Sequence, residues 1–342
     1  MNDILLVRLD GLGDALACVP MLEGLARRYS EARFHVVCSA RNAGVFSPAR
    51  VRTLEAEAVG FRGLLKTVEY DAAIVATDEV AGYEIARLSG APRRVGFWHR
   101  FEKPFKSIWQ RSQLTDAVYR PAGQRRAEHE VEVLYRLAAA LGAPPKPPAD
   151  PNALRRWLHV DRDSAGERAG AVGFQVTAKL ASGSWGPSAL GKCFAAALAA
   201  AGSRRCALLC ARADEELARA VLEHLVAARA DFERISQIVG ASVSHWFGVI
   251  DALDALVSPD TGAAHAAGML GVPVVDLFDC DRFEQSSRRW RPWASPSRCL
   301  VKPRWRPGLE DALGAEIGGA LQIMLSDRDG IARGSRSSML IS

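Results

Sequence analysis

Two polar turns between strands and helices hold the residues best suited to chemistry. One is Asp260-Thr261-Gly262, which follows the apolar run 255–258 and precedes the helix-forming run 263–270. A helix that begins here directs its first amides and the positive end of its dipole into the turn, which suits an anion such as a diphosphate. His265, in the first helical turn, can add a further donor. The alternative is a capped core helix that carries an incidental histidine.

The other turn lies near the start of the chain. The apolar run 4–9 leads into Asp10-Gly11-Leu12-Gly13-Asp14, and a helix pattern follows to about Tyr29. This is not a dinucleotide fingerprint, because Leu16 occupies the third glycine position of G-x-G-x-x-G, and a nicotinamide-dependent oxidoreductase is therefore disfavoured. Asp14 is either a partner of the helix dipole or a general base that faces a cleft.

Alternating strand and helix patterns place both turns at strand ends. Strands are predicted at 4–9, 34–39, 71–77, 94–97, 170–176, 205–210, 234–239, 255–258 and 272–278. Because open α/β sheets bind ligands at the carboxyl ends of their strands, the two turns are candidate sites. A proline-rich segment, 143–151, separates the two halves.

Four segments, in this order, resemble glycosyltransferase family 9, the ADP-heptose heptosyltransferases of lipopolysaccharide synthesis. They are VRLDGLGDALACVP (7–20), HEVE (129–132), GASVSHWFGVIDALDALVSPDTG (240–262) and SPDTGAAHAAGMLGVPVVDLF (258–278). The combination of an N-terminal G-x-G-D with a later D-T-G-x-x-H box is specific, whereas either half alone is weak.

The resemblance implies a GT-B architecture, an α/β fold in which two Rossmann-like domains face a central cleft. We expect an acceptor-binding domain over 1–152, a nucleotide-sugar-binding domain over 153–325 and a flexible tail over 326–342. The last helix, 311–325, is expected to pack back on the first domain.

The resemblance also implies an inverting transfer of heptose from ADP-heptose with no metal or other cofactor. Asp14 matches the family's general base, and the D-T-G box matches its contacts to the donor sugar and phosphates. The expected donor-binding residues are Gly13, Thr177, Lys179, Ser182, Ser184, Asp260, Thr261, Gly262, Ala263 and His265.

The sequence departs from the family in the loop that follows the strand at 170–176. A lysine two residues before Trp-Pro is usual, but here Gly183 precedes Ser184-Trp185-Gly186-Pro187. Lys179 can supply the missing cation from the same loop, Lys192 from the next helix, or Arg212 from the turn after Cys210. Ser182 and Ser184 can bind a phosphate as neutral donors.

Composition limits the other possibilities. A net charge of +5 over 342 residues, spread along the chain, is not the footprint of a nucleic-acid-binding protein. No apolar run approaches the length of a transmembrane helix, and the N-terminus lacks a signal-peptide pattern, so a cytoplasmic protein is expected. The seven cysteines include no C-x-x-C pair, and no metal site is predicted.

Basic segments suggest where an anionic acceptor could bind. Residues 98–114 show little periodicity, and Arg94, Arg100 and Lys103 are candidate acceptor contacts on a basic rim, although a solvated loop is the alternative. Residues 282–306 mix arginines with Trp290, Trp293 and Trp305. They form either Arg–Trp stacking on a folded surface, which we favour slightly, or a patch that contacts anionic headgroups of the inner membrane.

The predicted partners are thus a nucleotide-sugar donor and an anionic glycolipid acceptor, with peripheral membrane contact and no nucleic acid. Two alternatives on the same fold stay open. One is a protein heptosyltransferase that acts on serine hydroxyls, and the other is a catalytically weakened protein that binds the donor.

Overall fold

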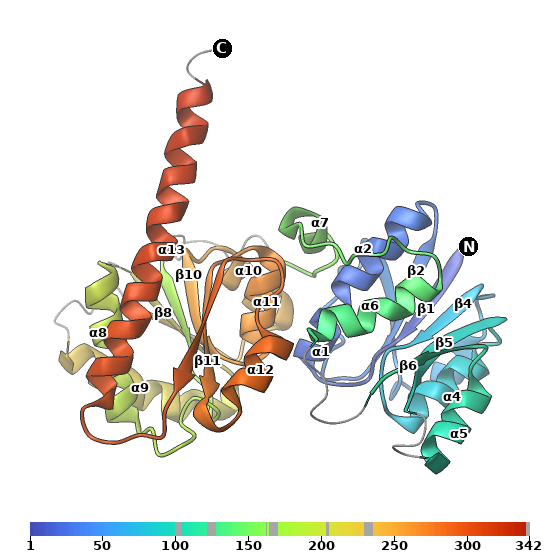
Figure 1. Ribbon diagram of the computed structural model, residues 1–342, viewed down its shortest axis with the longest axis horizontal. Helices are drawn as coiled ribbons and strands as arrows, with labels where there is room; N and C mark the ends of the chain where they lie inside the picture. Colours follow the sequence, from blue (N-terminus) through green and yellow to red (C-terminus); the bar gives the residue numbers. More distant parts are fainter. Residues whose placement is uncertain are drawn as a thin grey trace. The chain divides into compact units, whose positions relative to one another are not determined.

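The structure is a computed structural model that describes residues 1–99, 104–121, 128–161, 163, 170–202, 205–228 and 235–339. The chain forms two compact units (Figure 1). The first comprises Met1–Val160 and Arg288–Trp293, and the second comprises Asp161–Ser287 and Ala294–Ser342. The division therefore falls after Val160 rather than after residue 152, and the short segment Arg288–Trp293 belongs to the first unit.

The first unit is built on a parallel six-stranded sheet with the order β3-β2-β1-β4-β5-β6. Its strands are β1 (Asp3–Val7), β2 (Arg33–Cys38), β3 (Val51–Glu55), β4 (Ala72–Val75), β5 (Arg93–Trp98) and β6 (Asp116–Tyr119). The central strands are buried throughout, as their continuous apolar runs predict. This strand order is that of a Rossmann fold, in which the ligand crevice lies where the strand order reverses, next to β1.

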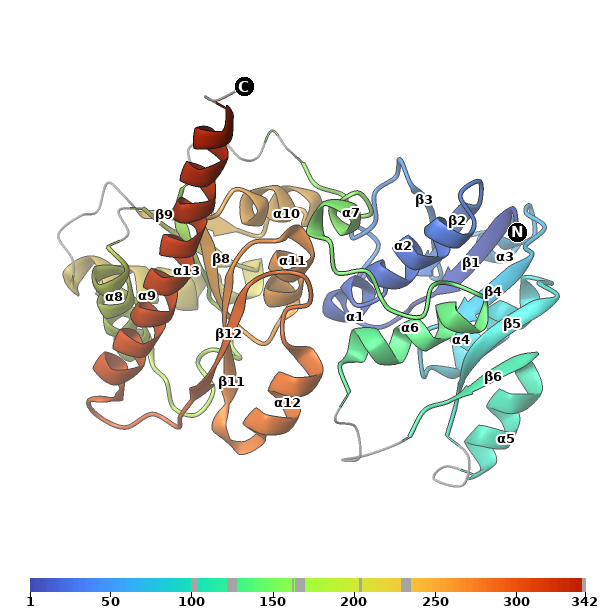
Figure 2. The same ribbon diagram turned by 45° about the horizontal axis from the view of Figure 1, so that its top comes forward.

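Helices cover both faces of this sheet. They are α1 (Leu12–Leu16), α2 (Val19–Arg28), α3 (Phe61–Leu65), α4 (Val80–Leu88), α5 (Pro104–Gln113), α6 (Glu130–Ala140) and α7 (Pro151–Arg155). Figures 1 and 2 show α2 and α6 on one face and α4 and α5 on the other, where α3 also contributes to the hydrophobic core. The alternative of a solvated loop over 98–114 does not hold for Pro104–Gln113, because this segment forms α5.

The second unit repeats the arrangement, with the parallel sheet order β12-β11-β10-β7-β8-β9. Its strands are β7 (Val172–Gln175), β8 (Cys206–Cys210), β9 (Ile235–Val239), β10 (Ala255–Pro259), β11 (Val274–Asp279) and β12 (Ser297–Lys302). Its helices are α8 (Pro187–Ala201), α9 (Glu215–Ala228), α10 (Val243–Asp251), α11 (Gly262–Leu270), α12 (Phe283–Trp290) and α13 (Leu309–Met339), with short 3-10 turns at Arg212–Asp214 and Cys280–Arg282. The order reverses between β7 and β10, so the loops after these two strands flank the second switch point.

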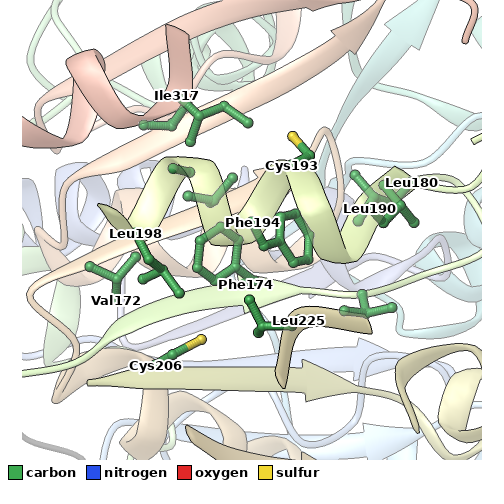
Figure 3. Packing of buried hydrophobic residues seen from close by; sticks show 14 of the residues in the cluster. Val172, Phe174, Leu180, Leu190, Cys193, Phe194, Leu198, Cys206, Leu225 and Ile317 are labelled. Atoms are coloured by element: carbon green, nitrogen blue, oxygen red, sulfur yellow. The ribbon is translucent and has the colours of Figure 1, made fainter. Parts of the chain in front are cut away.

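The core of this unit lies between the sheet, α8 and α13. Phe174 of β7 packs on Phe194 of α8 with ring centroids 4.2 Å apart, and Ile317 of α13 joins the same cluster (Figure 3). Gly314 and Gly318 let α13 approach α8 closely, because a Cβ at Gly318 would lie 2.4 Å from Ala200 Cβ. The last helix therefore packs on α8 of its own unit. It also continues to Met339, beyond the predicted end at residue 325.

Candidate active site

Asp14 lies at the carboxyl end of β1, in the first turn of α1. The buried guanidinium of Arg8, which directly follows β1, donates from Nη2 to Asp14 Oδ1 over 2.6 Å. Arg8 Nε lies 3.3 Å from Asp10 Oδ2, and Nη1 donates to the carbonyl of Ala76. One fixed cation thus orients the Asp14 carboxylate, whose side chain is still about one-third exposed.

The environment raises the pKa of Asp14 above its ordinary value. Burial is the main cause, and the negative charges of Asp10 and Glu130 add to it, whereas the charge of Arg8 opposes them. A carboxylate that is partly desolvated, oriented and still accessible is suited to accept a proton from a bound hydroxyl. Gly13, expected to contact the donor, lies in α1 and its carbonyl accepts from the Ala17 amide.

Further polar groups gather at the same edge of the first sheet. Asn42, fully buried after β2, donates to the carbonyls of Arg8 and Asp10 over 3.1 and 2.8 Å. After β4 and β5, Asp78 Oδ1 lies 3.3 Å from His99 Nε2. Burial alone would raise the pKa of Asp78, but the hydrogen bond with His99 and the charge of Arg120 outweigh it and lower the pKa.

A buried ion cluster completes this edge. The carboxylate of Glu130, at the start of α6, accepts from Arg120 over 2.6 Å and from Arg289 over 2.9 Å. Two arginines on one buried carboxylate compensate its desolvation, so removing Glu130 would leave both cations uncompensated. Through Arg289, the cluster also anchors the segment Arg288–Trp293 to the first unit.

The tryptophans of the basic segment 282–306 are engaged within the protein. Trp293 Nε1 donates to Pro148 O over 2.8 Å, and Trp305 Nε1 donates to Glu310 over 3.2 Å. The guanidinium of Arg289 lies 4.9 Å from the ring centroid of Trp290. These contacts agree with the favoured interpretation of Arg–Trp stacking on a folded surface.

Of the three predicted acceptor contacts, the structure describes only Arg94. Arg94 lies at the start of β5, at the opposite edge of the sheet, and donates to the carbonyls of Gln113 and Ala91, each over 2.8 Å. Arg94 therefore lies away from the carboxyl edge that holds Asp14, and its role as an acceptor contact stays a prediction. Arg100 and Lys103 lie outside the described residues.

In the second unit, the start of α11 leaves its amides open. Thr261 is the N-cap residue, but its side chain makes no capping hydrogen bond. Its hydroxyl instead lies 3.1 Å from Ser258 Oγ. Among the described residues, therefore, the Thr261 side chain does not block the amides of Gly262 and Ala263, which remain suited to an anion.

Lys179, Asp260 and His265 meet beside this helix start. Lys179, in the loop after β7, donates from Nζ to Asp260 Oδ2 over 2.8 Å and also to the Asp260 carbonyl. His265 Nε2 lies 3.7 Å from Asp260 Oδ1. The two loops that flank the switch point of the second sheet thus place a lysine and a histidine at the open end of α11.

A buried lysine, Lys302, holds the rest of the loop after β7. Its Nζ donates to Ser182 O over 2.7 Å and to Ser182 Oγ over 2.8 Å, and lies 3.0 Å from Asp279 Oδ1. Thr177 Oγ1 accepts from the amide of Leu180 over 3.4 Å, so the hydroxyls of Thr177 and Ser182 both bind within the loop. Gly183 and Ser184 follow with φ values of +71° and +69°. A lysine at position 183 would therefore be strained, which argues against a simple restoration of the usual cation.

Asp276 is a buried carboxyl group behind the box. It is fully inaccessible, and neither of its oxygens has a hydrogen-bond partner among the residues that the structure describes. Burial raises its pKa well above the ordinary value, and the charge of Asp260 adds to this, while Lys179 opposes it. Burial without a hydrogen-bond partner thus favours the neutral form of this carboxyl group.

The other two candidate cations lie elsewhere in the second unit. Lys192 is exposed on α8, and its charge acts on Glu310 at the start of α13. Arg212 follows β8, is largely exposed and lies 3.6 Å from Glu215. Arg212 thus lies at the carboxyl edge of the second sheet, whereas Lys192 lies on α8, near the start of α13.

Four residues of these two edges were not identified from the sequence as parts of the site: Arg8, Asn42, Asp276 and Lys302. Three of them, Arg8, Asp276 and Lys302, share a signal, because each is a charged residue within or directly after apolar residues of a strand. A buried strand charge needs a partner or a shifted pKa, and either points to a functional edge.

Two searches of the described residues gave negative results. No group of three or more histidine, cysteine, aspartate or glutamate side chains there could hold a metal ion. Within the same residues, no helix combines the length and apolar character needed to cross a bilayer.

Comparison with known proteins identifies the family. The model of glycosyltransferase family 9 (heptosyltransferase) matches residues 60–310, which include the box at Asp260 but begin after Asp14. A search of curated proteins found no match.

Solved structures show the same fold. The ADP-heptose lps heptosyltransferase II of E. coli is 18% identical with a TM-score of 0.70, over 96% of this chain and 100% of that chain. A family 9 glycosyl transferase from Veillonella parvula DSM 2008 is 15% identical with a TM-score of 0.70, over 95% and 97%. The E. coli heptosyltransferase WaaC with ADP is 18% identical with a TM-score of 0.67, over 95% and 99%. The chain therefore belongs to glycosyltransferase family 9, the heptosyltransferase family, and has its GT-B architecture of two Rossmann-like sheets.

Proposed function

We propose that this protein transfers a heptose from ADP-heptose to a hydroxyl of a lipopolysaccharide core or related anionic glycolipid, with inversion at the anomeric carbon. The observation that carries the proposal is Asp14, a partly exposed carboxylate with a raised pKa that Arg8 holds at the carboxyl edge of the first sheet. Two structures of similar fold are described as an ADP-heptose lps heptosyltransferase and as WaaC with ADP-2-deoxy-2-fluoro heptose, which supports this donor.

In the proposed reaction, Asp14 accepts the proton of the acceptor hydroxyl as the oxygen attacks the anomeric carbon. The bond between the anomeric carbon and the diphosphate breaks on the opposite side, and ADP leaves with its electrons. Direct displacement by one nucleophile inverts the anomeric centre. Arg8 acts as a positioning residue, because its bond to Asp14 fixes which carboxylate oxygen stays available.

The second unit stabilises the leaving diphosphate. The open amides of α11, His265 and Lys179 supply donors and positive charge where the charge develops, which lowers the barrier. In this proposal Asp260, which accepts from Lys179, also accepts hydrogen bonds from the sugar hydroxyls. In this proposal these groups neutralise the diphosphate without a metal ion, so chelation should leave activity intact.

Calorimetric titration with ADP-heptose, followed by an assay of ADP release with a core glycolipid, tests the proposal. We expect saturable binding, acceptor-dependent ADP release and a product of inverted configuration by NMR. Binding without acceptor-dependent turnover would indicate a donor-binding protein instead. Transfer to a serine peptide in place of the glycolipid would indicate a protein heptosyltransferase.

A further inference from the structure

Helix α5 presents a pair of exposed apolar side chains to solvent. Phe105 is 89% exposed and Ile108, one turn later, is 70% exposed. The opposite face of α5 is buried through Ser107 and Gln110. Since residues three apart share one face of a helix, Phe105 and Ile108 form one outward-facing apolar patch, here called the α5 patch.

The α5 patch lies at the edge of the first sheet that also carries Asp14. Lys106 donates from Nζ to the carbonyl of Asp78, over 2.7 Å, and Ser107 Oγ accepts from the His99 amide. His99 directly follows β5, and Asp78 lies in the loop between β4 and α4. The first turn of α5 is therefore fixed at the carboxyl edge.

The neighbouring helix adds an exposed apolar residue at the same edge of the sheet. Trp109 of α5 packs against Tyr83 of α4, with ring centroids 5.9 Å apart. Since α4 and α5 each follow a parallel strand, both begin at the same edge. Val80, the first residue of α4, is 48% exposed there.

The charges on α5 define the kind of surface that fits. Its sequence, PFKSIWQRSQ, contains two cations and no carboxylate. Arg111 is exposed one turn after Ile108, on the same face as the patch. Apolar side chains beside cations, with no acid on the helix, match an anionic lipid surface, where the cations meet headgroups and the apolar groups enter the acyl boundary.

We propose that the α5 patch docks the protein on the surface of an anionic bilayer and so brings the Asp14 edge to a lipid-linked acceptor. This inference rests on the proposed function, because a glycolipid acceptor is presented at such a surface. A protein partner fits less well, since a stable protein interface buries roughly 800 Å² on each side and the patch offers only a few side chains.

The test uses the full chain and sedimentation with vesicles of phosphatidylglycerol or of phosphatidylcholine. We expect binding to the anionic vesicles, and weaker binding at high salt because the Debye length shortens. The double variant Phe105→Ser/Ile108→Ser should lower the partition coefficient at least about tenfold, since each buried apolar side chain contributes to insertion. Ile323→Ser is the matched control, an exposed isoleucine on helix α13 of the other unit, and should bind like the unchanged protein.

Turnover distinguishes this inference from the proposed function. On a deacylated, soluble acceptor the double variant should match the unchanged protein, while on a vesicle-borne acceptor its KM should rise and its kcat should stay the same. Equal vesicle binding by the unchanged protein and the double variant would overturn the inference, as would no binding by either. Self-association that the double variant abolishes would assign the patch to a second copy instead. Absence of turnover on the soluble acceptor would count against the proposed function alone.

Discussion

Lys179 and Asp260 are 81 residues apart in the sequence, yet the lysine ammonium donates to the aspartate carboxylate over 2.8 Å. The contact joins the loops that follow β7 and β10, on either side of the switch point of the second sheet. It places a cation beside the open amides of α11, where a leaving diphosphate would need one, although Gly183 occupies the usual lysine position. The role of Lys179 in binding the donor remains a prediction, and the contact supports it.

Lys179→Ala should therefore lower turnover more than Lys192→Ala. Loss of a preorganised donor to a developing charge typically lowers the rate by a factor on the order of 10². Lys192 is exposed on α8, so its replacement by alanine should change turnover little. Steady-state turnover of the two variants at saturating donor decides between them.

The competing candidate for the phosphate cation is Arg212, at the end of β8. The alanine variant of Arg212 belongs in the same assay. If Lys179→Ala leaves turnover unchanged and Arg212→Ala lowers it, the assignment of Lys179 as the phosphate cation is wrong.

His265→Ala should weaken ADP binding by about 1–3 kcal/mol, the range for a hydrogen bond to a charged group. Calorimetry with ADP measures this directly. EDTA should leave both the affinity for ADP and turnover unchanged. Loss of turnover in EDTA with recovery in Mg²⁺ would refute the metal-free mechanism.

Asp276 predicts a pH dependence of stability. The pKa of Asp276 is raised in the folded state, whereas the unfolded side chain ionises at about pH 4. Between these two pKa values the folded state binds one proton more than the unfolded state. The free energy of unfolding must then fall as pH rises through this window. Asparagine at position 276 does not titrate. In urea titrations, the free energy of unfolding of Asp276→Asn, relative to that of the unchanged protein, should therefore increase from pH 5 to pH 8. A stability difference that is the same at both pH values would contradict a raised pKa for Asp276 in the folded state.

Arg8 should control the pH profile of activity. Its charge lowers the pKa of Asp14 against the effect of burial, so Arg8→Met should move the acidic limb of kcat/KM to higher pH. Arg8→Lys keeps the charge and should shift the limb less. An unshifted limb in a folded Arg8→Met protein would mean that Asp14 is not the group that titrates.

Much of the fold follows from the sequence, because the central strands are continuous apolar runs between helix patterns. The strands β3, β6 and β12 were missed, and all three lie at sheet edges. An edge strand is partly exposed, so β3 combines buried valine and leucine with exposed arginine, threonine and glutamate. Such a segment lacks the apolar run that identifies a buried parallel strand.

The candidate site was predicted where a turn has a recognisable composition and missed where a partner is distant in sequence. The turns at Asp14 and Asp260 were found from local pattern alone. The partners Arg8 and Lys302 lie within or after apolar strands, and only the sheet register shows which loop they hold. Arg94, the second residue of β5, lies at the amino ends of the strands, opposite to the strand-end loops, and its role as an acceptor contact stays a prediction.

The most direct test of the central claim is the turnover of Asp14→Asn with ADP-heptose and a core glycolipid, measured beside Asp10→Asn. Asparagine keeps the shape of the side chain and cannot accept the proton, so turnover should fall by ~10²–10⁴ while the affinity for ADP changes little. Asp10 contacts the same arginine at 3.3 Å, and its variant should retain most of the activity. If Asp14→Asn turns over at nearly the rate of the unchanged protein, Asp14 is only a partner of the helix start and the proposed mechanism is wrong.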